Sequence, residues 1–300
     1  MKKLLLINNQ SPGDALVMTA TIESLHRLYP NQYITSCQTN CNAVFEHNPH
    51  VVEPDDVFER VQMEYPLIHE SNQRPVHFIQ GFTDHLGKYL NISLPCVVNK
   101  PFLYVSKEEK AWTNQVQEQF GYKGGFWLLN AGTKPDYTVK GWGSFNYQQV
   151  IDALYGKIVF VQVGEKHHNH KTLRGTIDLI GKTTSRQLIR LAYHAQGGLT
   201  GVSFMHHIMA AFSKPCVTIA SGMEPKSWEI YNSGVYLSSH GMLPCCQHSA
   251  CWKSQVVGKT GKVCELPIYG EEEVIPKCMA MINPLTVVKA IEDYHFGLKL

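Results

Sequence analysis

Residues 3–28 read KLLLINNQSPGDALVMTATIESLHRL, and this stretch decides the fold expected for the chain. Its short apolar run, residues 4–7, predicts a buried strand. The turn-forming residues at 8–14 predict a tight loop. Apolar residues follow at helical spacing until Tyr29-Pro30 ends the pattern. A strand, a glycine loop and a helix form the unit that binds ligands at the carboxyl end of a strand in open parallel sheets.

The carboxylate of Asp14 falls in the first turn of the expected helix, at the mouth of the expected crevice. One interpretation is local: the carboxylate accepts from free backbone amides and complements the helix dipole, which stabilises a helix by about 1 kcal/mol. The other is that it acts on a bound substrate. The residues of this stretch leave both interpretations open.

The composition is that of an ordinary globular protein. The chain has 300 residues, 44 % of them apolar, and a formal net charge of +2. This length exceeds what one core usually holds, so we expect two domains. The small charge, without a run of Lys or Arg, argues against a nucleic-acid or membrane surface. No stretch of about 20 apolar residues predicts a transmembrane helix, and the first apolar run is too short for a signal peptide.

Strand and helix patterns alternate along the chain, stop, and then alternate again. Before the stop, the last pattern is a charged helix expected over residues 107–120. The glycine-rich segment at 121–125 then interrupts both periodicities, as domain boundaries do. We therefore predict two doubly wound α/β domains that face each other, residues 1–121 and residues 122–300.

The start of the chain resembles the heptosyltransferases of glycosyltransferase family 9. In that family a Ser-x-Gly-Asp loop follows the first strand, as Ser11, Gly13 and Asp14 do here, and its Asp is the proposed catalytic base. The resemblance implies the GT-B fold, in which two Rossmann-like domains face each other across a cleft. It also implies that the first domain binds the acceptor and the second binds a nucleotide sugar.

Three loops of the second half resemble the same family, in the family's order. Thr133 and Lys140 match a loop after a strand and the Lys-x-Trp that follows it; they would give a hydroxyl and a cation to a leaving diphosphate. Gly164-Glu165 ends the next expected strand, where Rossmann-like domains hold ribose hydroxyls with a carboxylate. Gly181 opens a Gly-Lys-Thr-Thr segment similar to the family's Gly-Lys-Thr-Ser. The alternative for Lys140 is an ordinary surface lysine.

A fourth segment, residues 200–215, reads TGVSFMHHIMAAFSKP and resembles the family's Asn-Asp-Ser-Gly-x-x-His helix start. Ser203 and His207 match, and a helix N-terminus aimed into the cleft is a ready anion site. Val202 stands where the family has Asp, and Phe204 stands where it has Gly. These departures leave the position or the identity of the sugar donor open. The alternative for His207 is a histidine of the core.

The resemblance implies an inverting glycosyltransferase that moves a sugar, by analogy a heptose from ADP-heptose, to a hydroxyl acceptor on a glycan or protein. Asp14 and Lys140 would be its catalytic residues. No catalytic cofactor is expected, because amides, hydroxyls and Lys140 would meet the charge of the diphosphate. Two alternatives stay open: an inactive sugar-nucleotide-binding or scaffold protein of the same fold, and an epimerase of GT-B form.

Five cysteines gather in residues 243–278, a loop poor in apolar residues. Nine cysteines in all, an odd number, disfavour a secreted disulfide framework, so we expect reduced thiols and a cytoplasmic protein. Four thiolates suit a tetrahedral zinc or iron ion, and the autotransporter heptosyltransferases, a related group, carry iron on such cysteines. The alternative is free buried thiols. The expected ligands of a structural iron or zinc ion are Cys246, Cys251, Cys264 and Cys278.

Overall fold

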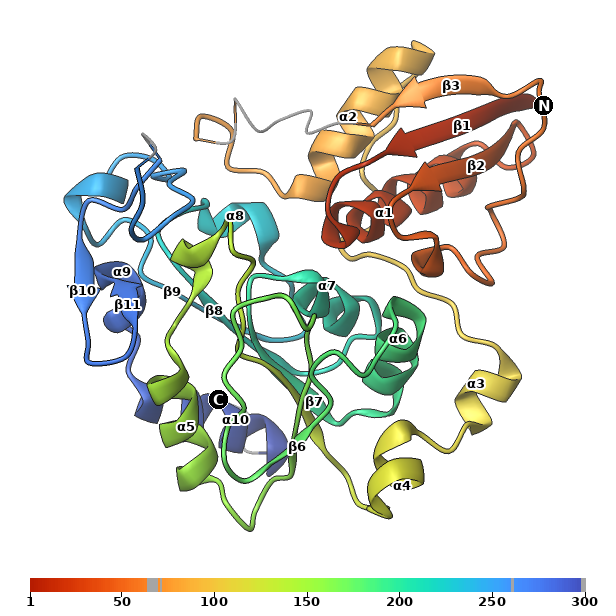
Figure 1. The fold of residues 1–300 in the computed structure, drawn as a ribbon. Helices are drawn as coiled ribbons and strands as arrows, with labels where there is room; N and C mark the ends of the chain where they lie inside the picture. Colours follow the sequence, from red (N-terminus) through yellow and green to blue (C-terminus); the bar gives the residue numbers. More distant parts are fainter. Residues whose placement is uncertain (64–69, 71, 260–261, 298–300) are drawn as a thin grey trace.

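The computed structural model describes residues 1–63, 70, 72–259 and 262–297. Its first half is a small parallel sheet with the strand order β2-β1-β3, seen at the upper right of Figure 1. The expected strand and helix at the start of the chain are both confirmed. The elements of this half are β1 (Lys2–Asn8), α1 (Pro12–Leu28), β2 (Tyr33–Thr39), a 3-10 turn η1 (Asn42–Val44), β3 (Glu59–Gln62) and α2 (Phe78–Leu90).

The side chains of β1 alternate between two apolar clusters, as the pleat of a strand requires. Leu4 and Leu6 belong to the main core, which includes residues of α1 and α2. Leu5 and Ile7 pack with Phe58 in a small cluster of their own. The strand is therefore buried on both faces, which explains why its sequence is a continuous apolar run.

The second half is a six-stranded parallel sheet with the order β6-β5-β4-β7-β8-β9. Numbered within this half, the order is 3-2-1-4-5-6, that of the doubly wound dinucleotide-binding fold. Its strands are β4 (Trp127–Asn130), β5 (Phe160–Gln162), β6 (Thr176–Asp178), β7 (Gly197–Gly201), β8 (Cys216–Ala220) and β9 (Val235–Ser238). Its helices are α5 (Ser144–Ala153), α6 (Ser185–His194), α7 (Phe204–Ala211), α8 (Lys226–Glu229), α9 (Lys277–Ala280) and α10 (Pro284–His295), with 3-10 turns η2 (Thr138–Lys140) and η3 (Pro244–Cys246) and a hairpin of β10 (Pro267–Tyr269) and β11 (Val274–Pro276).

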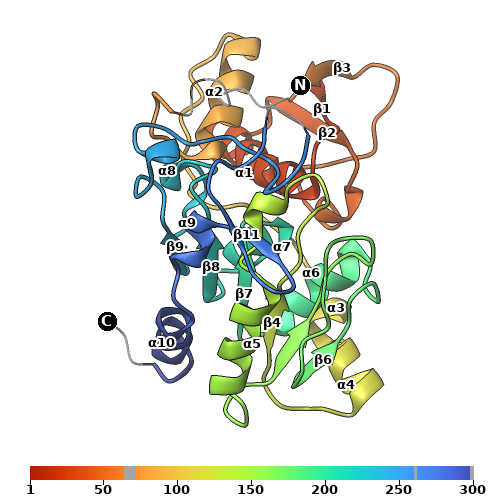
Figure 2. The same cartoon turned by 60° about the vertical axis from the view of Figure 1, so that its left-hand side comes forward.

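Helices cover both faces of this sheet. Leu128 of β4 packs in the core that holds residues of α6 and α7. Its neighbours Trp127 and Leu129 pack in a second core with residues of α5 and α10. Figure 2 shows α5 and α10 on one side of the sheet and α6 and α7 on the other. The predicted doubly wound fold is thus present, because alternate residues of one strand serve two helical layers.

The structure corrects one predicted helix. The pattern over residues 107–120 gives two short helices, α3 (Lys107–Ala111) and α4 (Gln115–Phe120), because the side chain of Asn114 accepts from the Gln117 amide and begins a new helix. Gln115 also donates to the Lys182 carbonyl at 3.1 Å, so this connector packs on the second half. No helix in the described ranges is long and apolar enough to cross a bilayer. The domain boundary near residue 121 stays a prediction.

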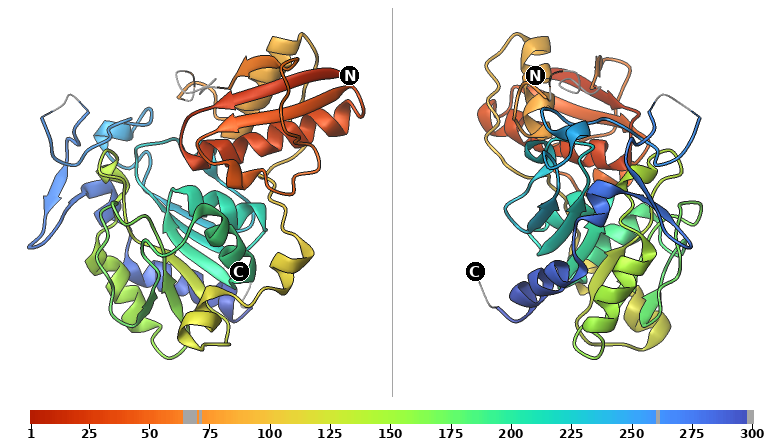
Figure 3. Two further views of the ribbon diagram at one scale, coloured as in Figure 1. Left: turned by 45° about the vertical axis from the view of Figure 1, so that its right-hand side comes forward. Right: turned by 90° about the vertical axis from the view of Figure 1, so that its left-hand side faces the viewer.

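The two halves share one core. The largest apolar cluster runs from Leu4 and α1 of the first half to Leu128, α6 and α7 of the second. The left view in Figure 3 shows the first half seated on the α7 side of the second, with the β10-β11 hairpin at the edge of the molecule. Phe78 at the start of α2 stacks on Trp228 of α8, with ring centroids 5.1 Å apart. Part of the contact between the halves is therefore apolar.

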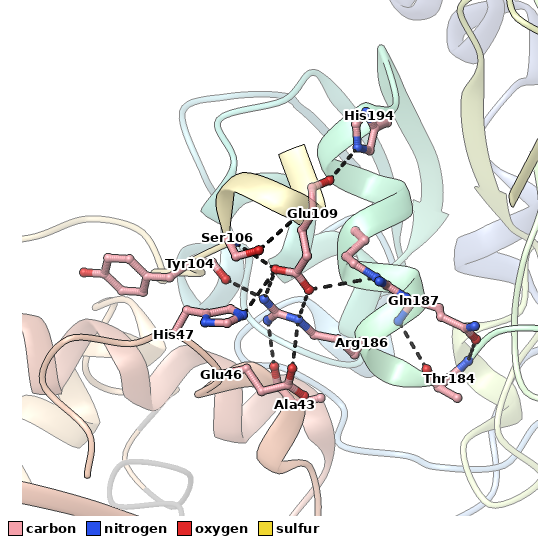
Figure 4. A network of polar contacts seen from close by, with 11 residues as sticks. Ala43, Glu46, His47, Tyr104, Ser106, Glu109, Thr184, Arg186, Gln187 and His194 are labelled. Carbon is pink, nitrogen blue, oxygen red and sulfur yellow. Dashed lines mark hydrogen bonds and ion pairs between the residues drawn. The ribbon is translucent and has the colours of Figure 1, made fainter. Parts of the chain in front are cut away.

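Arg186 of α6 joins the two halves and the connector between them (Figure 4). It donates to both carboxylate oxygens of Glu109 in α3 and lies 3.2 Å from Glu46 of the first half. Its remaining N–H groups donate to the carbonyls of Ala43 and Tyr104, at 3.1 and 2.8 Å. Burial alone raises the pKa of Glu109, but the Arg186 hydrogen bonds and charge outweigh burial and the pKa lies below its usual value. The result is a buried, paired charge at the junction.

Candidate active site

The start of α1 lies at the junction of the halves. Ser11 is the N-cap in an extended conformation, and Pro12 fits the first helical position. The Ser11 amide donates to Oδ2 of Asp14 at 2.9 Å, so the local capping interaction is present. Ser11 Oγ also lies 3.3 Å from Lys134 Nζ, which belongs to the loop after β4. Asp14 is only 6 % exposed. Its carboxylate thus caps the helix, and its charge also raises the pKa of Lys140 in the second half.

Gly13 allows α1 and α7 to approach closely. A Cβ atom on Gly13 would lie 3.0 Å from Cδ2 of His207, tighter than ordinary van der Waals contact. The His207 ring is held by Tyr231, whose hydroxyl lies 2.9 Å from Nδ1. The structure therefore brings together Gly13 and His207, which are far apart in sequence. His207 is also a residue of the core, since it is 4 % exposed.

Charged groups gather beside this contact. Lys140 Nζ forms an ion pair with Glu224 Oε1 at 2.9 Å. Burial alone lowers the pKa of Lys140, but the carboxylate of Glu224 and further acidic groups raise it more, so Lys140 is an ammonium at neutral pH. Those further groups are Glu229 and Asp14. The Lys140 side chain is 22 % exposed and paired with a carboxylate, so it is not a freely solvated lysine.

Glu229 differs from the other carboxyl groups of this cluster. It is 5 % exposed, and Oε1 lies 3.7 Å from Nε2 of His207. Burial raises its pKa well above the ordinary value, and the negative charge of Glu224 raises it further. Burial and the neighbouring negative charge thus favour the protonated form of Glu229.

The histidines of the cluster are neutral. Burial lowers the pKa of His207 well below its ordinary value, and that of His206 to about 4. His206 is held between the Thr218 hydroxyl, 2.7 Å from Nδ1, and the Glu229 carbonyl, 2.8 Å from Nε2. Burial also lowers the pKa of His77, the N-cap of α2, to about 3. Because these imidazoles are neutral, they add no positive charge to the charged cluster around Lys140.

The other expected binding residues lie along the carboxyl edge of the second sheet. Thr133 follows β4, Gly164 and Glu165 follow β5, Gly181 follows β6 and Ser203 precedes α7. Ser203 Oγ lies 2.9 Å from Thr200 Oγ1 of β7. The strand order reverses between β4 and β7, and ligands of doubly wound sheets bind outside the strand ends at that point. The loops of Thr133 and Ser203 flank it. Glu165 is exposed, and the expected binding residues are spread along this edge and do not surround a single point.

The cysteine-rich loop surrounds one cavity. All five cysteines of residues 243–278 line it, and all five thiols are free. A Cβ atom on Gly222 would lie 2.7 Å from Cys246 Sγ, so the loop closes tightly on β8. Val139 and Met223, the neighbours of Lys140 and Glu224, line the same cavity. Among the described residues, the one set of three metal-ligand atoms within 4.8 Å of one another is elsewhere, at Glu46, His47 and Glu109. The hydrogen bonds from Arg186 already occupy that Glu109 carboxylate.

Neither a scan against protein-family models nor a search of the curated proteins found a match. Solved structures do match over the whole chain. Heptosyltransferase II of E. coli, an ADP-heptose lipopolysaccharide enzyme, has a TM-score of 0.63 and 15 % identity, covering 100 % of both chains. A family 9 glycosyltransferase from Veillonella parvula has a TM-score of 0.66 and 12 % identity, covering 99 % of this chain and 97 % of that one. The fold is that of the family 9 glycosyltransferases.

A third structure with this family 9 fold is the iron-containing dodecameric glycosyltransferase TibC of enterotoxigenic E. coli. It has a TM-score of 0.64 and 14 % identity, and the match covers 99 % of this chain and 77 % of TibC. Another TibC structure was solved with ADP-D-β-D-heptose bound. At these identities the likeness establishes the fold, and the predicted GT-B arrangement is confirmed.

Within this family 9 fold, the two residues that depart from the family's sequence pattern pack in apolar clusters. Val202 packs with Ala220 and Tyr236, and Phe204 packs against the main core. The missed members of the charged cluster are Glu224 and Glu229, on the segment after β8. Their only sequence signal is a pair of acidic residues just beyond the carboxyl end of a buried strand.

Proposed function

We propose that the protein is an inverting glycosyltransferase that takes its sugar from a nucleotide sugar and transfers it to a hydroxyl group. The observation that carries this proposal is that Asp14 of the first half lies near enough to Lys140 of the second for its charge to raise the pKa of that lysine, at the strand ends of a family 9 fold. A base and a cation on opposite sides of a junction suit an acceptor hydroxyl on one side and a diphosphate on the other. ADP-heptose, which two structural neighbours carry in their names, is the first donor to test.

Asp14 would act as the general base. As the acceptor oxygen attacks the anomeric carbon, a C–O bond forms, the bond from that carbon to the diphosphate oxygen breaks, and the acceptor proton passes to Asp14. Attack opposite the leaving group inverts the anomeric centre. Capping does not remove this capacity, because the Ser11 amide occupies Oδ2, and a carboxylate accepts at several lone-pair positions.

Lys140 would stabilise the leaving diphosphate, with the Thr133 hydroxyl and the amides at the start of α7 as neutral donors. In the structure Lys140 pairs with Glu224 at 2.9 Å. An ammonium has three N–H groups, so it can keep this partner and still donate to a phosphate oxygen. Glu224 thereby fixes the direction of the cation. These groups supply the charge stabilisation, so we propose no catalytic metal ion.

The donor is tested by thermal melting against ADP, GDP and UDP and their common sugar conjugates. A ligand present at 100 times its Kd stabilises the folded protein by about 2.7 kcal/mol, so a true donor raises the melting temperature by several degrees. Transfer of labelled sugar to an acceptor then distinguishes the enzyme from a binding or scaffold protein. Conversion of the sugar without an acceptor would identify the epimerase. A panel in which no nucleotide shifts the melting temperature contradicts the proposal.

Lys140→Ala is expected to weaken binding of the nucleoside diphosphate product about tenfold or more and to slow transfer, because a charge-assisted contact to phosphate is lost in both states. Titration calorimetry with the nucleoside diphosphate measures the first effect. Lys157→Ala is the matched control, since Lys157 pairs with Glu292 at the same 2.9 Å on a distant surface. Equal product affinity in the two variants would remove Lys140 from the diphosphate site.

We also propose that the cysteine-lined cavity holds one structural zinc or iron ion. The chemistry of the donors suits either ion, because thiolates are preferred ligands of both and five cysteines line one cavity. No three of their sulfur atoms, all in the described ranges, lie within 4.8 Å of one another, so a bound ion would draw the loop tighter around it. Four of them, Cys246, Cys251, Cys264 and Cys278, would complete a closed tetrahedral site, with Cys245 left over. A closed site lacks an open position for substrate, so its role would be to order the loop. TibC, described as iron-containing, supports the choice of iron.

A further inference from the structure

The segment 165–170, here called the lid, crosses the carboxyl edge of the second sheet. It follows β5, and residues 163–175, all described, form no helix before β6. The lid pairs with the loop after β4: the Asn169 amide donates to the Thr133 carbonyl at 2.9 Å, and the Thr133 amide donates to the Asn169 carbonyl at 3.3 Å. The Asn169 side chain adds a contact of 3.5 Å to Thr133 Oγ1.

The lid also fills the space that three glycines leave open. A Cβ atom on Gly132 would lie 2.1 Å from Cε1 of His170, and one on Gly164 would lie 2.2 Å from the same atom. The His170 ring therefore enters a slot between the ends of β4 and β5 that only glycines can form. Farther along the edge, Lys166 covers Gly181 in the same way, at 2.7 Å. The lid lies over the ends of β4, β5 and β6.

The closed position leaves polar atoms unsatisfied. Both ring nitrogens of His170 are buried without a hydrogen-bond partner among the described residues. A buried polar atom without a partner lowers stability, because it has lost its water and gained nothing in return. Burial also lowers the pKa of His170 to about 4, so the ring is neutral in the slot. The ring would recover its hydrogen bonds by leaving.

We infer that residues 165–170 are a lid that blocks the protein's own donor site. The lid fills the diphosphate and ribose part of that site and is displaced when a nucleoside diphosphate binds. The inference rests on the proposed function. Its central point is competition for the loop of Thr133, which the lid covers through both backbone groups of Thr133 and through a contact of the Asn169 side chain to its hydroxyl oxygen. A diphosphate that accepts from the same hydroxyl needs the space that the lid fills, so the closed lid and a bound diphosphate exclude each other. Apparent affinity then falls by the fraction of molecules that are open.

Hydrogen exchange on the wild-type protein is the first test. Without ligand, the Asn169 amide is protected by Thr133, so a peptide covering residues 165–171 exchanges slowly. Saturating ADP, GDP or UDP, whichever shifts the melting temperature, should make this peptide exchange at least several times faster. Ligands usually slow exchange where they bind, so acceleration is a result that a lid produces and a fixed wall does not. Unchanged or slower exchange in the bound protein would overturn the inference.

His170→Ala is the second test. Removal of the His170 ring should tighten binding of the same nucleoside diphosphate about tenfold. This is the gain expected if the lid is closed nine-tenths of the time. His167→Ala is the control, because His167 is an exposed histidine of the same segment. Weaker or equal binding by the His170 variant would show that the ring is a binding or packing residue. If this variant does not fold, the exchange experiment on the wild type decides.

The two proposals fail differently. If no nucleoside diphosphate binds either the wild type or His170→Ala, both the donor site and its lid are rejected. If a nucleoside diphosphate binds and the 165–171 peptide stays protected, the lid is rejected and the proposed function stands.

Discussion

Asp14→Asn is expected to reduce turnover by roughly 10² or more while KM changes little, because the acceptor proton then has no base to receive it. The measurement is initial-rate kinetics with the donor that the melting screen identifies. Asn keeps a side-chain oxygen that can accept from the Ser11 amide, so the helix cap survives and the melting temperature should stay within a few degrees.

The matched control is Asp152→Asn, which removes an exposed carboxylate from α5. Full activity of the control beside an inactive Asp14 variant assigns the effect to the site. Asp14→Asn activity within a few-fold of wild type would remove the residue from the mechanism. A variant that unfolds would instead show that Asp14 acts as a cap alone. A wild type that binds nucleotide sugar and never transfers it would favour the scaffold alternative.

Protein purified without chelator is expected to contain about one zinc or iron ion per chain, and its removal to destabilise the loop greatly, since thiolate coordination contributes on the order of 10 kcal/mol in small zinc domains. Elemental analysis and melting with and without chelator measure both effects. Cys264→Ser should lose the ion, whereas Cys96→Ser, in the first half, should keep it. A metal content far below one per chain, with all nine thiols titratable in the folded protein, would leave free cysteines.

Much of the fold follows from local patterns. The run at residues 4–7 and the loop at 8–14 predict β1 and α1 because their signals are contained in a few neighbouring residues. The break at Asn114 was missed, although Asn is a strong N-cap, because charged residues on either side continue the helical period.

Less of the site could be predicted, for a physical reason. Asp14 and Lys140 stand out through motifs, each of which is local. Glu224 and Glu229 become important only because β8 ends beside β7 and directs the next segment toward Lys140. Likewise, the raised pKa of Glu229 depends on burial and on a neighbouring charge, and neither can be read from the sequence. Tertiary contacts, and not propensities, create these properties.

The guanidinium of Arg186 has a consequence for protein engineering. Proteins of this fold can be recombined by fusing the first half of one to the second half of another, and the glycines at residues 121–125 are the obvious crossover. A crossover there would separate Arg186 from Glu109, Tyr104 and Ala43, which all lie on the other side. Loss of one partner from a buried ion pair destabilises by about 3–5 kcal/mol. A chimera should therefore inherit α6 together with the first half, or carry a new residue at position 186.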